Sequence, residues 1–248
     1  MLLVIAVTLV ASGYSLWVRR DTWRSRWEAG ASLAIALEGC ALVLMSPGSA
    51  AALGPPLHRI VGLWNVQHLI GHLCLIVAIA AIIYHVLTRF SDEGHIRALF
   101  HRQVEVPVKV AVPVAMVLFV VADEEYHADL FPAHVTDIWL GAYWLLFCGL
   151  VIYLCGYAMR LLLIARTDPR ARATVDLYLI SAAFGVAAAA IQVGTAVAGI
   201  DVAAPVWVCT CLAIAIFAYA STRSWQAKVA WFTSGDNPPS QTVPPPSA

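Results

Sequence analysis

Charged side chains are scarce in this chain of 248 residues, where they make up 12% of the sequence against 61% for hydrophobic residues. A soluble globular domain carries roughly 25% charged residues and about 45–50% apolar ones. The mean hydropathy of +0.79 is too high for such a domain. The composition therefore excludes a soluble globule, and a formal net charge of zero offers no basic field to attract nucleic acid.

The cysteines lack the patterns that mark metal or redox sites. The chain has six of them, none in a CxxC pair, and all fall inside hydrophobic segments. Neither a disulfide framework nor a zinc site is expected from this arrangement. The simpler interpretation is that these small apolar residues pack between helices.

Long apolar segments are what the chain has in abundance. A helix needs about 20 mostly apolar residues to cross a bilayer core of about 30 Å, and helices satisfy their own backbone polar groups within lipid. The segments that meet this requirement are 1–18, 29–45, 60–87, 104–122, 136–164, 174–198 and 204–222, with outer loops expected at 46–59 and 123–135. The sequence thus predicts an all-α polytopic membrane protein, a seven-transmembrane-helix bundle within residues 1–228.

Basic residues are distributed asymmetrically around these segments. If the N-terminus lies outside, every basic residue except Arg59 falls in a cytoplasmic loop or at an adjoining helix end. This is the distribution that the positive-inside rule describes. Arg19 and Arg20 follow the first apolar segment, whereas a secretory signal peptide has its positive charge before the apolar stretch. We expect a multi-pass protein of the plasma (inner) membrane with its N-terminus outside and its C-terminus in the cytoplasm.

The last part of the chain has a different composition. Residues 229–248 are rich in proline and serine. Such a segment has too little apolar surface to pack, so we expect a disordered cytoplasmic tail.

Polar side chains within the predicted spans are functional candidates, because burying them in hydrocarbon is costly. At 100° per residue, Asn65, His68 and His72 lie within an arc of about 60° on one face of the third span. Glu38 lies near the middle of the second span, and His72 or His68 is its expected partner. Gln192 adds a hydrogen-bonding group in the sixth span. Together these residues predict a polar path in the outer half of the bundle, although structural hydrogen bonds between helices explain them equally well.

The outer loop and the start of the fifth span are rich in carboxylates and imidazoles. His127, His134 and Asp137 are the candidate ligands of a divalent metal, with His134 and Asp137 about one helical turn apart. An acidic, solvated loop explains the same composition. No catalytic residue and no cofactor are predicted, and a bound divalent metal is the alternative.

Residues that the last span lacks argue against two classes of seven-helix protein. Microbial rhodopsins need a lysine there to bind retinal, and segment 204–222 has none, which excludes that class. Seven-helix intramembrane hydrolases place paired histidines in their last helix, and this segment has no histidine. An enzyme of that class is therefore disfavoured, although His68, His72 and the carboxylates of the outer loop keep it open.

Several segments resemble a family of actinobacterial seven-helix membrane proteins that are classed as transporters. They are EGCALVLMSP at 38–47, HRIVGLWNVQHLIGHLCLIVAIAAII at 58–83, and the stretch from DIWLGAYWLLF through the loop at 166–172. His72 matches the histidine of that family's third helix. The resemblance implies transport and names no substrate. Family members usually continue into a cytoplasmic C-terminal domain, whereas this chain ends in the proline-rich tail.

Three functions follow from these features. The first is transport of a small molecule or ion, or sensing of a ligand, through the polar path. The second is a non-catalytic interaction or signalling module that recruits a cytoplasmic protein, or a second copy of itself, through its basic loops and tail. The third is a metal-dependent membrane enzyme. Replacing His72 or Glu38 should abolish the first function, whereas for the second function deleting residues 231–248 should have a larger effect than changing His72.

Overall fold

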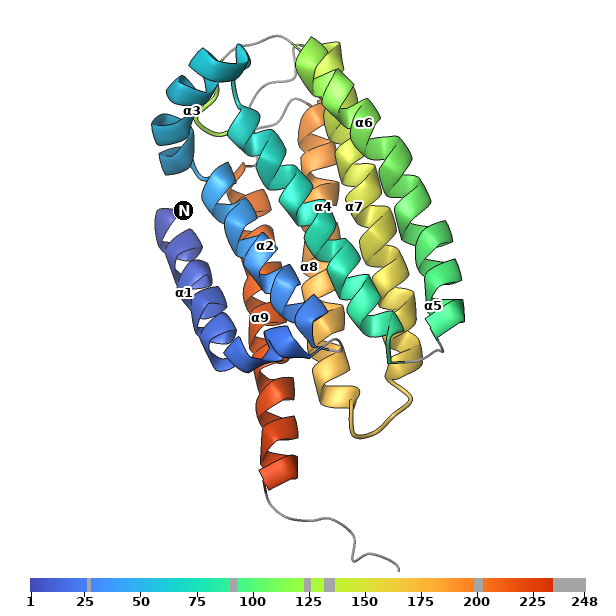
Figure 1. Cartoon of the computed structure of the whole chain (residues 1–248). Helices are drawn as coiled ribbons and strands as arrows, with labels where there is room; N and C mark the ends of the chain where they lie inside the picture. Colours follow the sequence, from blue (N-terminus) through green and yellow to red (C-terminus); the bar gives the residue numbers. More distant parts are fainter. Residues whose placement is uncertain (26–27, 90–92, 123–125, 132–136, 199–202, 234–248) are drawn as a thin grey trace, which may run out of the picture.

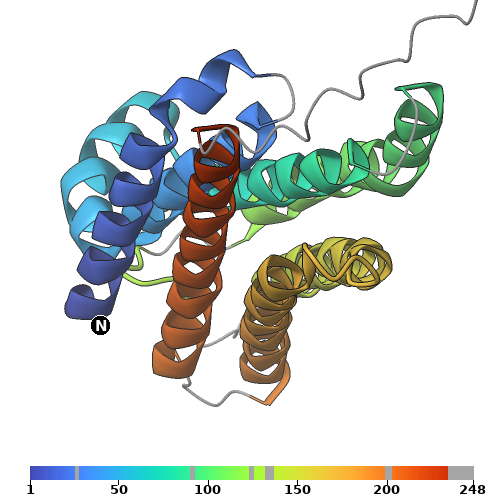
Figure 2. The same ribbon diagram turned by 90° about the horizontal axis from the view of Figure 1, so that it is seen from below.

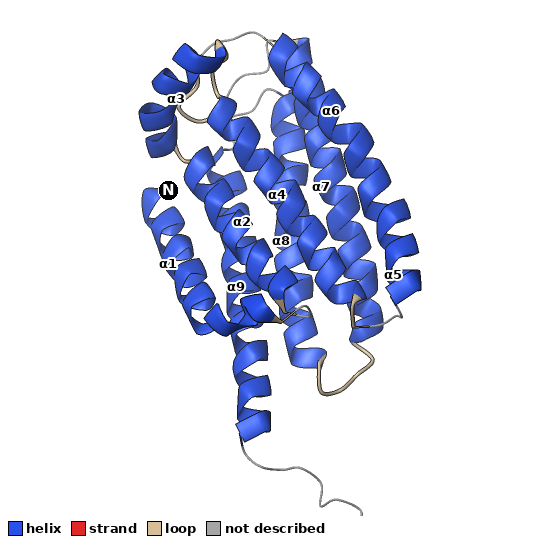
Figure 3. Ribbon diagram, viewed as in Figure 1, coloured by secondary structure: helices blue, strands red, loops and turns tan. Residues whose placement is uncertain are grey.

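The computed structural model describes residues 1–25, 28–89, 93–122, 126–131, 137–198 and 203–233 (Figure 1). Within these residues every regular element is a helix, and Figure 3 shows no strand among them. The elements are α1 (Leu2–Val18), a 3-10 turn η1 (Arg20–Arg24), α2 (Ala29–Met45), α3 (Pro47–Val61), α4 (Val66–Leu87), α5 (Glu93–Phe100), a π-helical turn η2 (His101–Glu105), α6 (Val106–Val121), α7 (Ile138–Ala165), α8 (Arg172–Ala198) and α9 (Ala203–Thr233). The prediction of an all-α fold is confirmed.

Five helices are long and apolar enough to cross a membrane. They are α4, the continuous helix Gly94–Val121 that includes α6, and α7, α8 and α9. The pair α2 and α3 passes the same test together, with a bend of 75° between the two helices. The shorter apolar helix α1 has 17 residues. The described chain therefore has the five to six apolar helices of a multi-pass membrane protein.

The outward faces of these helices are apolar as well. Val7 and Val10 on α1, Val110 and Val117 on α6, and Ile164 on α7 are all exposed. A soluble monomer rarely exposes apolar surface on this scale, whereas lipid tails contact it at no cost. Half of the most apolar stretch of α4 and of α7 is buried, against 17% for the helix that includes α6. Helices α4 and α7 are thus central, and α6 lies at the periphery of the bundle.

The helices form a closed arrangement around a shared interior. In Figures 1 and 2, α1 lies beside α9, and α6 lies beside α7 on the opposite side. Helix α2 packs along α4, α4 against α7, α7 against α8, and α8 against α9. Helix α3 lies at one end of the bundle, and the connections that follow α1, α4 and α7 lie at the other end.

Close packing of α2 on α4 depends on glycines. A Cβ atom on Gly71 of α4 would lie 2.6 Å from Met45 Cγ, and one on Gly30 of α2 would lie 3.2 Å from His85 Cβ. Small residues of this kind let two helix backbones approach within a membrane. The two helices are therefore held together near both of their ends.

The predicted outer loop at 46–59 and the predicted third span at 60–87 are both corrected. Most of the loop is α3, which begins after Ser46, whose Oγ accepts a hydrogen bond from Ser49 N at 3.3 Å. Helix α3 ends at Gly62 with φ of 80°, and Asn65 precedes α4 with φ of 59°. Glycine adopts the left-handed region freely and asparagine tolerates it. These two residues divide the predicted span, so the helix proper begins at Val66.

Other helix ends extend beyond their predicted limits. The helix of the fourth span starts at Glu93 rather than at residue 104, because α5 and η2 run into α6. Helix α9 continues to Thr233, past both the predicted end of the last span and the predicted start of the tail. Residues 234–248, the rest of that tail, lie outside the described residues.

Candidate functional site

A cavity of about 100 Å³ lies between α2, α4, α7, α8 and α9. Its lining is mostly apolar and includes the aromatic rings of Trp144, Phe147 and Phe217. Among the described residues that line it, Glu38 is the one carboxylate, and none is a lysine, arginine or histidine. The other polar lining residues are Tyr178, Ser181, Gln192 and Thr210. The bundle thus encloses a largely apolar space with one acidic group.

Glu38 has no polar partner among the described residues that line this cavity. Its side chain comes from the middle of α2 and is 5% exposed, and its Oε2 atom has no hydrogen-bond partner among the described residues. The expected pairing of Glu38 with His72 or His68 is wrong, because His72 Nδ1 is hydrogen-bonded to the Tyr143 hydroxyl at 2.6 Å instead. The carboxyl group is left facing the cavity.

Gln192 on α8 supplies a second polar group without a full set of partners. Its Nε2 donates to the carbonyl oxygen of Phe131 at 3.4 Å, and its Oε1 has no partner among the described residues. The hydroxyl groups that line the cavity have partners. Ser181 Oγ donates to Ala213 O at 2.7 Å, and Thr210 Oγ1 donates to Val206 O at 2.8 Å. The Tyr178 hydroxyl is hydrogen-bonded to Ser221 Oγ at 3.1 Å. The open hydrogen-bonding capacity is therefore that of Glu38, Gln192 and the Trp144 indole, whose Nε1 also has no partner among the described residues.

His72 lies outside this cavity, in an aromatic cluster between α4 and α7. Its ring centroid is 4.4 Å from that of Phe147 and 5.1 Å from that of Trp144. The space beside it is about 10 Å³, room for no more than a single water molecule. Packed and hydrogen-bonded in this way, His72 fastens α4 to α7.

Asn65, directly before α4, and His68, in the first turn of α4, both contact the segment around His127. Asn65 Oδ1 accepts a hydrogen bond from His127 N at 3.1 Å. The backbone of His127 also interacts with the buried His68 ring, whose Nε2 has no partner among the described residues. The five residues of the predicted path therefore occupy three places: Glu38 and Gln192 at the cavity, His72 between α4 and α7, and Asn65 with His68 beneath the loop.

The candidate metal ligands are not brought together by the part of the chain that is described. Asp137 caps α7, where its Oδ1 accepts from Trp139 N at 2.9 Å. His134 lies outside the described residues. Within those residues, no three histidine, cysteine, aspartate or glutamate side chains form a group that could hold a metal ion. A divalent metal bound by His127, His134 and Asp137 stays a prediction.

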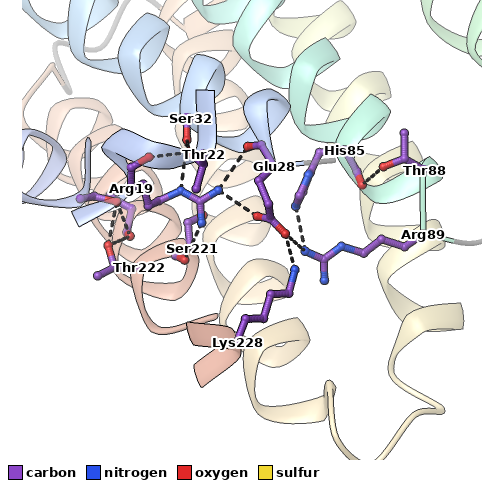
Figure 4. A network of polar contacts seen from close by, with 12 residues as sticks. Arg19, Thr22, Glu28, Ser32, His85, Thr88, Arg89, Ser221, Thr222 and Lys228 are labelled. Carbon is purple, nitrogen blue, oxygen red and sulfur yellow. Dashed lines mark hydrogen bonds and ion pairs between the residues drawn. The ribbon is translucent and has the colours of Figure 1, made fainter. Parts of the chain in front are cut away.

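A buried polar network occupies the opposite end of the bundle (Figure 4). At its centre is Arg19, which is only 1% exposed. Its guanidinium group donates to Ser32 Oγ at 3.2 Å, Ser221 O at 2.8 Å, Glu28 O at 3.3 Å and Glu28 Oε2 at 3.0 Å. One side chain from the end of α1 thus joins α2 and α9.

Glu28 is the acidic member of this network. Besides Arg19 it contacts Lys228, with which it forms a hydrogen bond and ion pair, and Arg89 at 3.5 Å. Burial by itself raises the pKa of the Glu28 carboxyl. The hydrogen bond from Lys228, with the electrostatic interactions of Lys228, His85 and Arg89, outweighs that effect and holds the pKa below its ordinary value of 4.5. Glu28 is therefore an ionised link between α1, α2, α4 and α9.

This network is not predicted from the sequence. Position along the chain places Arg19 among the basic residues that flank a span and gives no role to Glu28. A carboxylate directly before an apolar helix, on the basic side and shortly after an arginine, was the available indication.

Comparison of the chain with protein-family models, curated proteins and solved structures gives no match.

Proposed function

We propose that this chain is a seven-helix protein of the plasma (inner) membrane that binds a small molecule in its central cavity, to transport it or to sense it. The observation that carries the proposal is the Glu38 carboxyl group, which faces an apolar cavity without a partner among the described residues. Transport is also what the resemblance to the actinobacterial transporters implies.

The number of spans in this proposal follows from the lengths of the helices. Helix α1 has 17 residues, at the lower end of the range of about 17–25 that can span a bilayer. With α1 as one span and the bent pair α2–α3 as another, the five longer helices bring the total to seven. The basic connections after α1, α4 and α7 share one end of the bundle (Figure 1), which the positive-inside rule assigns to the cytoplasm.

A ligand site accounts for the cavity better than a packing defect does. Protein interiors have few voids larger than a water molecule, and an empty void lowers stability. Buried polar atoms are normally hydrogen-bonded. Glu38 Oε2 and Gln192 Oε1, however, have no hydrogen-bond partner among the described residues. A molecule that enters the cavity can fill the space and bond to both kinds of group.

The native cysteines offer a direct test of access to the cavity. Cys155 on α7 lines it, whereas Cys211 on α9 is equally well buried but does not line it. We would compare two variants, each keeping one of these cysteines and carrying alanine at the other cysteine positions. The probe is 2-aminoethyl methanethiosulfonate, a small water-soluble thiol reagent, applied to membrane vesicles of either orientation.

A cavity that exchanges its contents must open to water, so we expect Cys155 to react on the order of tenfold faster than Cys211, which reports only global unfolding. Thr167→Cys, in an exposed loop, serves as the fully accessible control. Equal rates at Cys155 and Cys211 would show that the cavity is sealed, and the proposed function would then be wrong.

A further inference from the structure

The chemistry of the cavity lining restricts what the proposed ligand can be. Glu38 is the one carboxylate among the described lining residues, and no basic side chain is among them. An ionised carboxylate in an apolar interior is strongly disfavoured unless a positive charge pairs with it. Glu38 therefore holds either a proton or a cation supplied from outside the protein.

The neighbours of Glu38 do not provide that cation. The titratable groups that share the cavity are the thiols of Cys148 and Cys155 on α7 and the hydroxyl of Tyr178 on α8. The described lining residues from α4 and α9 are not titratable. Elsewhere on α4, His72 is bonded to Tyr143, and His85 lies beside Arg89 in the network of Figure 4.

The remaining lining favours an organic cation over a metal ion. Calcium takes six to eight oxygen ligands, and magnesium demands a near-octahedral set. The lining is mostly hydrocarbon, with the rings of Phe131, Trp144, Phe147, Tyr178 and Phe217 among its members. Aromatic faces attract ammonium groups and also bury apolar surface. Such a lining suits a positively charged group attached to an apolar body.

The volume sets the size of that body. An engineered cavity of about 150 Å³ lined by apolar side chains binds benzene. The present cavity of about 100 Å³ is of the same order. Because the present cavity is the smaller of the two, a single ring with a one-carbon amine arm is the largest ligand to test.

We propose that the cavity binds a small lipophilic ammonium ion in exchange for a proton at Glu38. The protonated carboxyl gives up its proton to solvent, and the ammonium group takes its place as the ion-pair partner of the carboxylate. One positive charge enters and one leaves, so the interior stays neutral in both states. This inference rests on the proposed function, and it makes any transport of such a cation an exchange against protons.

The test uses benzylammonium as the cationic probe and benzyl alcohol as the neutral probe of nearly the same shape. Both are titrated into the purified full-length chain in detergent, with thermal stabilisation and proton release into weakly buffered solution as readouts. We expect benzylammonium to stabilise the protein, to release one proton per ion bound, and to lose affinity tenfold for each unit that the pH is lowered. Benzyl alcohol should release no proton and show no dependence on pH.

Two variants test whether the response depends on the Glu38 carboxyl group. Glu38→Gln should abolish stabilisation and proton release by benzylammonium while keeping the response to benzyl alcohol, and Asp168→Asn, in an exposed loop, should behave as wild type. If Glu38→Gln does not assemble, Ala189→Phe, which fills the cavity, should abolish the response to both probes.

Equal stabilisation of the wild type by both probes, binding of benzylammonium without proton release, or no response to benzylammonium would each overturn the inference. Labelling of Cys155 decides the proposed function separately. If Cys155 reacts but benzylammonium does not bind, the proposal of a cationic ligand is wrong, whereas the proposed ligand site is retained.

Discussion

Replacing Arg19 by methionine should destabilise the bundle far more than replacing its neighbour Arg20. Arg19 is 1% exposed, and its guanidinium group donates hydrogen bonds to Ser32, to the carbonyl of Ser221 and to two oxygens of Glu28. Arg20 is exposed, with its guanidinium carbon 5.6 Å from the centroid of the Trp17 ring. The two residues are adjacent and equally charged, so the comparison isolates burial.

The magnitude follows from what the substitution leaves behind. Removing one partner of a buried ion pair costs about 3–5 kcal/mol, because the other charge stays buried. Glu28 keeps Lys228 and Arg89, so we expect the lower end, about 3 kcal/mol, for Arg19→Met. For a chain of this length each kcal/mol corresponds to roughly 2–4 °C in Tm. The expected loss is therefore about 6–12 °C.

Thermal unfolding of the purified proteins in the same detergent measures this difference. Arg20→Met should lie close to wild type, since an exposed ion contributes little. If the Tm of Arg19→Met fell within about 2 °C of that of Arg20→Met, the network would not hold the helix ends together, and the reasoning would be refuted.

Two further predictions concern charge and packing. Because the folded-state pKa of Glu28 lies below 4.5, its ionisation contributes stability that is present above that pH and is lost as the pH falls through the folded-state value. Glu28→Gln should thus be less stable than wild type at about pH 7, and the difference in Tm between the two proteins should shrink as the pH falls through the folded-state pKa of Glu28; a difference that does not vary with pH would contradict this. Gly71→Ala should destabilise the contact of α2 with α4 by about 1–3 kcal/mol, since its Cβ would lie 2.6 Å from Met45 Cγ and 3.3 Å from Ala41 O. The control is Gly149→Ala on α7, where a Cβ meets nothing within 4 Å, and equal stability of the two variants would show that α2 and α4 separate easily.

Hydropathy predicted α7 and α8 almost to their ends, because an apolar run of this length has one stable form in lipid. The same reasoning failed at residues 60–65. Hydropathy averages over many residues, whereas the break depends on two backbone conformations at Gly62 and Asn65. Both residue types are known to adopt the left-handed region, so the break could have been considered from the sequence. Its occurrence depends on how α3 packs across the end of the bundle.

The candidate site, too, was predictable from the sequence only in part. Glu38 and His72 are both recognisable in the sequence as polar groups within the spans, since such groups are rare in hydrocarbon. Their expected pairing was wrong, because a shared depth in the membrane does not decide which faces of two helices meet. Tyr143 on α7 takes the position beside His72, and Glu38 turns to the cavity instead.

By itself the sequence determined the helical class, the membrane environment and the asymmetry of charge, because each depends on composition along the chain and not on contacts. Only the tertiary structure decided what the few polar groups do. The rotation and packing of each helix set whether a side chain meets a partner, as Arg19 does, or an open space, as Glu38 does. In an interior with so little charge, Arg19 is positioned to hold the bundle together, whereas the carboxyl group of Glu38 is available to a ligand.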